Sequence, residues 1–157
     1  MTNFSIPQTV NVIATNDEQA KVYEEDARRM GLNVKSTSVW TGPVPPNSFV
    51  EIAPNVAMAT PEYTFLRKTN QLPVDDAVTY GCALLSHYDT HLTSTSINIG
   101  ETYRRETPHT TPYEIFEYLL PIMDTAEAVT SLAILKECIE TLPTFERSCE
   151  EHCVGNE

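Results

Sequence analysis

The stretch from residue 48 to residue 88 constrains the fold most, because an extended segment there gives way to two consecutive helical patterns. The change occurs at Thr60, Pro61 and Glu62. A threonine side chain can accept hydrogen bonds from the free N–H groups of a helix start, proline suits the first helical position, and glutamate complements the positive end of the helix dipole. Apolar residues then recur at helical spacing before and after Pro73. The stretch predicts a packed fold and contains no evident catalyst.

The first forty residues follow a strand–helix–strand pattern. Residues 10–14 form a short apolar run that is typical of a buried strand. Asn16 can cap a helix over residues 17–30, and Gly31 suits the left-handed conformation that ends many helices. Residues 32–40 alternate between apolar and polar side chains, which predicts a second strand.

Two more short strands are expected after a proline-containing loop. Two short apolar segments, Phe49, Val50 and Ile52 and then residues 56–58, predict strands. Pro54 and Asn55 between them favour a turn, as in a hairpin. With the two strands of the first forty residues, we expect a small mixed sheet of four strands.

The remainder of the chain is predicted to be mainly helical. Residues 89–110 look like a polar connection whose only strand signal is at 97–99. Thr111 and Pro112 repeat the helix-start chemistry, and a last helix is expected over about residues 125–141.

These elements predict the α+β class, with a small mixed sheet from the N-terminal third packed against helices near 17–30, 61–86 and 112–141. We expect one domain over residues 1–145, followed by an acidic tail containing Cys and His over residues 146–157. The predicted core comprises the apolar residues at the inward positions of these elements: Val12, Ile13, Tyr23, Trp40, Phe49, Ile52, Phe65, Leu66, Val78, Phe116 and Leu135.

Composition narrows the class of partner. The chain has 157 residues and a formal net charge of −12. So negative a surface repels phosphate backbones, which disfavours direct nucleic-acid binding by this chain alone. Its apolar runs are too short to cross a bilayer, and the N-terminus lacks the basic head and apolar run of a secretory signal. We therefore expect a cytoplasmic protein whose partner is another protein, with no membrane contact.

His87 and His91 are four residues apart with Asp89 between them, and on a helix this spacing could place two imidazoles on one metal ion. The pair falls where the helical pattern gives way to a polar segment, and the sequence nearby offers no third ligand. Ordinary solvated histidines are the favoured interpretation.

Cys149, His152 and Cys153, with Cys138 upstream, are residue types that bind zinc. Their spacing lacks a second matching pair, as a zinc knuckle would require. With Cys82, the four cysteines are too few and too unevenly spaced for a secreted disulfide scaffold, so we expect reduced thiols. No metal ligand and no cofactor is assigned.

Three pairs of basic residues could form a local cationic patch: Arg28 with Arg29, Arg67 with Lys68, and Arg104 with Arg105. We favour solvated helix faces instead, because the surrounding charge is negative and no aromatic residues alternate with these pairs in the sequence.

A resemblance to a known group rests on residues within 46–88: Ser48, Phe49, Ile52, Pro54, Asn55, Val56, Met58, Ala59, Thr60, Pro61, Glu62, Phe65, Leu66, Gly81, Leu84 and Tyr88. In these residues the chain resembles the N-terminal region of actinobacterial proteins labelled endonuclease-like or type IV toxin-antitoxin antitoxin-like. The resemblance implies an N-terminal α/β region followed by a nuclease-like segment. This chain ends near where that segment would begin, so no catalytic residue is carried over. A shortened homologue and a separately made N-terminal domain both stay open.

Together these observations favour a non-catalytic interaction or regulatory domain, which could be an accessory part of a nuclease-like or toxin-antitoxin-like defence system. No catalytic residue is assigned. The alternative is a small metal-dependent hydrolase or nuclease-type enzyme that uses His87 and His91, or the Cys149, His152 and Cys153 tail.

Overall fold

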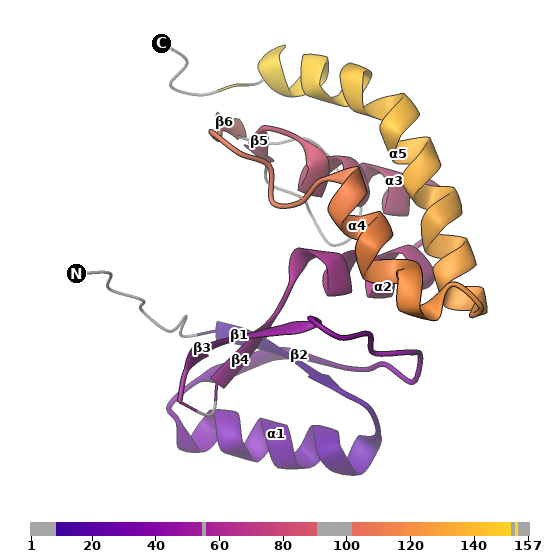
Figure 1. Cartoon of the computed structure of the whole chain (residues 1–157). Helices are drawn as coiled ribbons and strands as arrows, with labels where there is room; N and C mark the ends of the chain where they lie inside the picture. Colours follow the sequence, from indigo (N-terminus) through magenta and orange to yellow (C-terminus); the bar gives the residue numbers. More distant parts are fainter. Residues whose placement is uncertain (1–8, 55, 91–101, 152, 154–157) are drawn as a thin grey trace. The chain divides into compact units, whose positions relative to one another are not determined.

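The computed structural model describes residues 9–54, 56–90, 102–151 and 153. Helices and strands follow one another in an α+β arrangement, which confirms the predicted class. The chain divides into two compact units, Met1–Gly42 and Pro43–Glu157 (Figure 1). That residues 1–145 act as one folding domain stays a prediction. No helix in the described part of the chain combines the length and the apolar character needed to span a bilayer.

The first unit is a strand–helix–strand motif, as predicted. Strand β1 (Thr9–Ala14) pairs in parallel with β2 (Asn33–Val39), and helix α1 (Asp17–Arg29) connects them. The Asn16 side chain accepts a hydrogen bond of 2.7 Å from the backbone N–H of Gln19, which is the expected N-terminal cap. Gly31 ends the helix at a φ of 80°.

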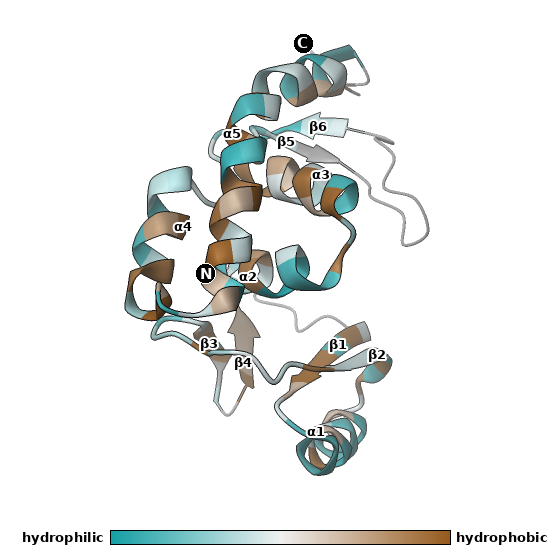
Figure 2. Cartoon of the chain, turned by 90° about the vertical axis from the view of Figure 1, so that its right-hand side faces the viewer, coloured by the Kyte–Doolittle hydropathy of each residue, from teal (hydrophilic) through white to brown (hydrophobic). Residues whose placement is uncertain are grey.

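Trp40 and several small apolar side chains form the buried part of the first unit: Val12, Ala14, Ala20 and Ala27. Tyr23 was expected in this core but is 41% exposed. Helix α1 is mostly hydrophilic (Figure 2). Only its alanines face inward, so the larger tyrosine lies at the edge of the apolar stripe.

The second unit begins with a hairpin of β3 (Phe49–Ala53) and β4 (Val56–Ala59), which pair antiparallel as predicted. The prediction of one four-stranded sheet is wrong. Among the described residues, the strands form separate two-stranded sheets, β1 with β2, β3 with β4, and β5 with β6. Local apolar patterns identify extended segments but carry no information on which strand edges meet.

Four α-helices and a 3-10 helix make up most of the described part of the second unit. Helix α2 (Pro61–Gln71) and helix α3 (Val74–Leu85) are separated at Pro73. Helix α4 (Pro112–Leu119) continues into the short 3-10 helix η1 (Leu120–Ile122), and helix α5 (Ala126–Glu151) packs along α2 and α3. Thr60 and Thr111 cap α2 and α4 by accepting from the backbone N–H three residues on.

Helix α5 extends ten residues beyond its predicted end at 141. It contains Pro143, whose missing backbone N–H disfavours the interior of a helix. Phe145 and Cys149 are buried at helical spacing from Cys138. Their packing holds the helix together past the proline, and residues 146–151 are its last turns rather than a tail.

Two short strands occupy part of the region predicted to be a polar connection. Strand β5 (Tyr88–Thr90) pairs antiparallel with β6 (Thr102–Arg104). Strands of three residues are too short for an alternating pattern to be visible in the sequence. The strand signal at residues 97–99 lies outside the described residues.

The core of the second unit lies between α2, α3, α4 and α5. Its fully buried side chains include Phe65, Leu66, Ile115 and Leu119. Phe49 and Phe116, both predicted to be core, are 48% and 44% exposed. The exposed position of Phe116 is the starting point for the functional site.

Candidate functional site

Helix α4 has apolar side chains on two opposite faces. Ile115, Tyr118 and Leu119 are buried against the second unit. At 100° per residue, Tyr113 and Phe116 fall on the opposite face, together with Leu120 in the first residue of η1. Their exposed fractions are 68%, 44% and 50%. We call Tyr113, Phe116 and Leu120 the α4 stripe.

The local sequence fixes α4 firmly in place. The Thr111 side chain accepts a hydrogen bond of 3.2 Å from the backbone N–H of Glu114, and Pro112 occupies the first turn. On the buried face, the hydroxyl oxygens of Tyr118 and Ser48 lie 2.6 Å apart, which ties the helix to the residue before β3. Burial raises the pKa of Tyr118 well above its usual value. The exposed face is therefore presented on a rigid support.

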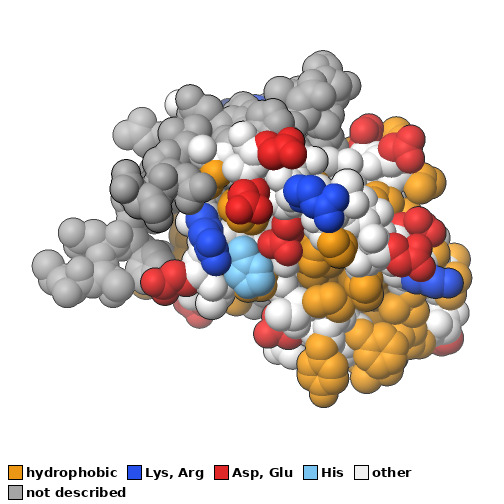
Figure 3. Space-filling view, turned by 90° about the horizontal axis from the view of Figure 1, so that it is seen from above, with side chains coloured by type: hydrophobic (Ala, Val, Ile, Leu, Met, Phe, Trp, Pro, Cys, Tyr) orange, Lys and Arg blue, Asp and Glu red, His pale blue; other side chains and the backbone are white. Residues whose placement is uncertain are grey.

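Acidic groups accompany the α4 stripe. The Tyr113 hydroxyl donates a hydrogen bond of 2.7 Å to a Glu117 carboxylate oxygen, and this bond raises the pKa of Tyr113. Glu114 and Glu117 are both exposed on the helix. Between residues 106 and 135 the sequence has no Lys or Arg but five acidic residues: Glu106, Glu114, Glu117, Asp124 and Glu127. In Figure 3, hydrophobic side chains gather at one edge of the view, and acidic side chains lie beside them.

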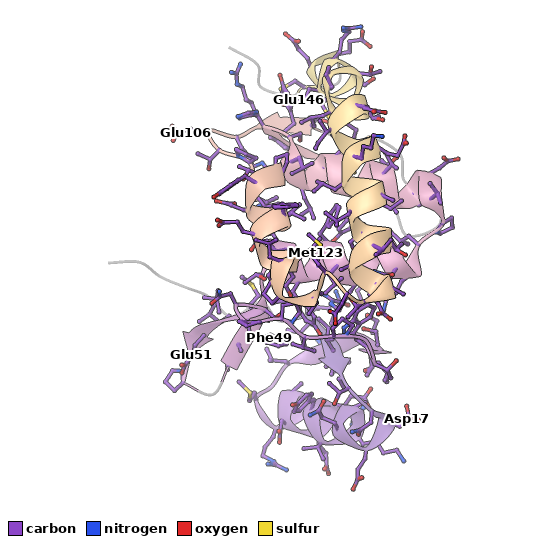
Figure 4. All side chains as sticks on the ribbon, turned by 45° about the vertical axis from the view of Figure 1, so that its right-hand side comes forward. Asp17, Phe49, Glu51, Glu106, Met123 and Glu146 are labelled. Carbon is purple, nitrogen blue, oxygen red and sulfur yellow. The ribbon has the colours of Figure 1, made fainter. Side chains whose placement is uncertain are left out.

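His87, from the predicted metal pair, lies directly after α3. Its backbone N–H donates a hydrogen bond of 3.0 Å to Glu146 of α5, and its ring Nδ1 lies 3.3 Å from the same carboxylate oxygen. Glu106 and Glu146 lie at the same end of the second unit (Figure 4). The Asp89 side chain and His91 lie outside the described residues, so the pair itself stays a prediction.

A shallow hollow of about 400 Å³ adjoins His87 and is lined also by Arg104, Arg105 and Glu106. One Arg105 nitrogen, Nη2, lies 2.8–3.2 Å from three carbonyl oxygens, those of Ala83 and Ser86 at the C-terminal end of α3 and that of Tyr88 in β5. A cation there complements the negative end of the helix dipole. Arg105 therefore joins the residue after β6 to the end of α3 and to β5, and His87 joins the same corner to Glu146 of α5.

Among the described residues, the four cysteines do not gather at one place in the second unit. Cys138 and Cys149 are fully buried on α5, and Cys153 is partly buried and forms an isolated bridge with Thr102. His152 lies outside the described residues. Where residues are described, no group of three or more His, Cys, Asp or Glu side chains could hold a metal ion.

Cys82 and Cys138 are neighbours between α3 and α5. The Cys138 thiol donates to the Val78 carbonyl oxygen at 3.4 Å, and the Cys82 thiol donates to the Cys138 carbonyl oxygen at 3.6 Å. The hydrogen bond with Cys82 and burial both raise the pKa of Cys138. A buried, neutral thiol is unreactive, so Cys138 serves as a packing residue.

The basic pairs match the favoured solvated faces only in part. Arg28 and Arg29 are exposed on α1. Arg67 is 5% exposed, and its guanidinium carbon lies 4.9 Å from the centre of the Tyr63 ring. Burial lowers the pKa of Arg67. The aromatic partner was present in the sequence four residues earlier, at the spacing that brings two side chains together on a helix.

Sequence reasoning assigned Phe116 to the core and so missed the α4 stripe. A helix with apolar residues on several sides is typical of a buried segment, and most residues of α4 are apolar or aromatic. The available signal was the pair of glutamates, Glu114 and Glu117, because charged residues are rarely buried without a partner.

Comparisons with family models, with curated proteins and with solved structures gave no match to this chain. The resemblance carried by residues 46–88 therefore stays a prediction. The geometry of α4 is the strongest functional evidence from the structure.

Proposed function

We propose that this chain is a non-catalytic interaction domain that binds another protein through the α4 stripe. The observation that carries the proposal is the doubly apolar α4, whose inner face already anchors the helix in its own core while Tyr113, Phe116 and Leu120 stay exposed. Exposed apolar side chains that cluster on one helix face are typical of interaction sites.

The support for the α4 stripe comes from its rigidity as well as its exposure. Aromatic side chains on a fixed helix lose little conformational entropy when a partner covers them, and such residues dominate the binding energy at interfaces. Phe116 lies between the other two members of the stripe and is the expected anchor.

The resemblance of residues 46–88 supports a finer statement of this function. We propose that the domain is a cytoplasmic accessory or regulatory part of a nuclease-like or toxin-antitoxin-like system. The enzyme that acts in such a system would then be supplied by the partner.

Site-specific photocrosslinking tests the proposed surface. The photoreactive amino acid p-benzoylphenylalanine would replace Phe116 or Tyr113, and in a control it would replace Val74, which is 62% exposed on α3. We expect a covalent adduct with one protein in the native host from the two α4 positions and none from Val74. Equal adducts from all three positions, or none from α4, would refute the proposal.

A further inference from the structure

We infer that the partner docks on the α4 stripe as an amphipathic helix whose apolar face is flanked by Lys and Arg. This inference rests on the proposed function and names the chemistry of the partner. It follows from the shape of the stripe and from the charges that accompany it.

The shape of the α4 stripe fits a helix. Tyr113, Phe116 and Leu120 have the spacing i, i+3 and i+7, which makes a narrow apolar row along α4 and the start of η1. A helix of eight residues is about 12 Å long, so the row matches two to three turns of a second helix lying along it. Helices that bind in this way present their own anchors at the same spacing.

The charge of the α4 stripe selects a basic partner. The Glu117 carboxylate flanks the row and, among the described residues, accepts one hydrogen bond, from Tyr113. A carboxylate can accept several, so Glu117 retains the capacity to accept from a Lys or Arg side chain. Glu114 lies one turn before it. No Lys or Arg occurs between residues 106 and 135, so with His neutral the formal charges of α4 and its flanking segments are all negative.

The same charges disfavour the other occupants. A second copy of the chain would bring another net charge of −12 to the interface. Nucleic acids and anionic membranes would be repelled in the same way. A helix with basic flanks is attracted at long range and fixed in register by the glutamates.

The experiment uses three peptides of about 18 residues that share one Leu-rich face, with a polar face of Lys, Gln or Glu. Fluorescence anisotropy measures their binding to the full chain, to Phe116→Ser, to Glu117→Gln and to the control Val74→Ser. Circular dichroism checks that each variant keeps the wild-type melting temperature. If Phe116→Ser melts at a lower temperature, Phe116→Leu, which preserves an apolar side chain, replaces it.

We expect the Lys peptide to bind at least about tenfold more tightly than the Gln peptide at low salt, and the Glu peptide to bind weakest. Phe116→Ser should lower the affinity for the Lys peptide about tenfold, and Phe116→Leu should lower it about threefold. Val74→Ser should change the affinity for the Lys peptide by less than about twofold. Glu117→Gln should lower the affinity for the Lys peptide about threefold and leave the affinity for the Gln peptide unchanged.

Three results would overturn the inference in distinguishable ways. Equal affinity for the Lys and Gln peptides, with both lost in the Phe116 variants, would remove the basic partner and leave the interaction surface standing. Binding of the Lys peptide that ignores the Phe116 substitutions would show general attraction to an acidic chain. If no peptide binds through α4, the inference fails, and the photocrosslinks from Phe116 then decide separately whether the proposed function fails with it.

Discussion

A methyl group added at Gly81 is the perturbation that best tests the packing of α3 against α5. Gly81 is buried, and a Cβ atom built on it would lie 2.4 Å from the Cys138 sulfur and 2.9 Å from Cε2 of Phe65. Favourable contacts between heavy atoms are about 3.5–4.0 Å. The methyl group would therefore overlap two side chains that belong to two different helices.

The expected magnitude follows from two opposing effects of Gly81→Ala. Alanine is favoured over glycine inside a helix by about 1 kcal/mol. Overpacking a core costs about 1–3 kcal/mol, and two close contacts place this site at the upper end. The thiol of Cys138 is also held by its hydrogen bond to Val78 and cannot move freely. We expect a net loss of about 2 kcal/mol in the free energy of unfolding.

Urea denaturation followed by far-UV circular dichroism measures this loss. Ala133→Gly on the exposed side of α5 is the matched control, and it should cost about 1 kcal/mol through helix propensity alone. In a background with Cys138→Ala, the sulfur is gone, and Gly81→Ala should cost at least about 1 kcal/mol less than in the wild type. Stabilisation by Gly81→Ala, or strict additivity of the two changes, would refute the close approach of α3 and α5.

Three further predictions concern buried polar groups. The Thr69 and Ser131 hydroxyl oxygens lie 2.7 Å apart between α2 and α5, so Thr69→Val should lower the free energy of unfolding by about 1–2 kcal/mol. The control Thr79→Val removes a hydrogen bond within α3 and should lower it by less than about 0.5 kcal/mol. Equal losses for the two variants in urea denaturation would contradict this prediction. Burial raises the pKa of Cys149 to about 11, so the folded state keeps this thiol neutral where an unfolded thiol ionises near 9. The free energy of unfolding should therefore fall as pH rises from 9 to 11, by at most about 1.4 kcal/mol per pH unit, and Cys149→Ala should show a shallower fall; parallel curves for the two proteins would exclude this contribution. Among the described residues no carboxylate forms an ion pair with the buried Arg67. Arg67→Met should therefore leave the free energy of unfolding unchanged or raise it. A fall of more than about 2 kcal/mol in urea denaturation would contradict this prediction.

The starts of the helices could be predicted from the sequence because their chemistry is local. Asn16, Thr60 and Thr111 each accept a hydrogen bond from the backbone N–H three residues later. A cap involves only neighbours in the chain, so a short sequence window contains all of its determinants.

The end of α5 and the pairing of the strands depend on residues far apart in the chain. Pro143 favours a helix stop locally, but the buried Phe145 and Cys149 continue the packing that Cys138 begins. Likewise, the apolar pattern of β3 does not reveal that its only strand partner among the described residues is β4. Tertiary contacts decide both features, and a local pattern cannot report them.

The candidate site was missed for a related reason. The apolar residues of α4 exceed what one core-facing side needs, and the sequence does not say which of them the core uses. Tyr118 is buried because its hydroxyl finds Ser48, seventy residues away. Once that contact fixes the rotation of the helix, Phe116 must point outward.

Chemical-shift mapping tests the central claim most directly, namely that the functional surface of this chain is the outer face of α4. The uniformly ¹⁵N-labelled chain would be titrated with the Lys-faced peptide, and the backbone amide signals followed. We predict that the largest shifts fall on Tyr113, Phe116, Glu117 and Leu120. Shifts concentrated at His87, Arg104 and Glu106 around the polar hollow, with the α4 signals unmoved, would contradict the account.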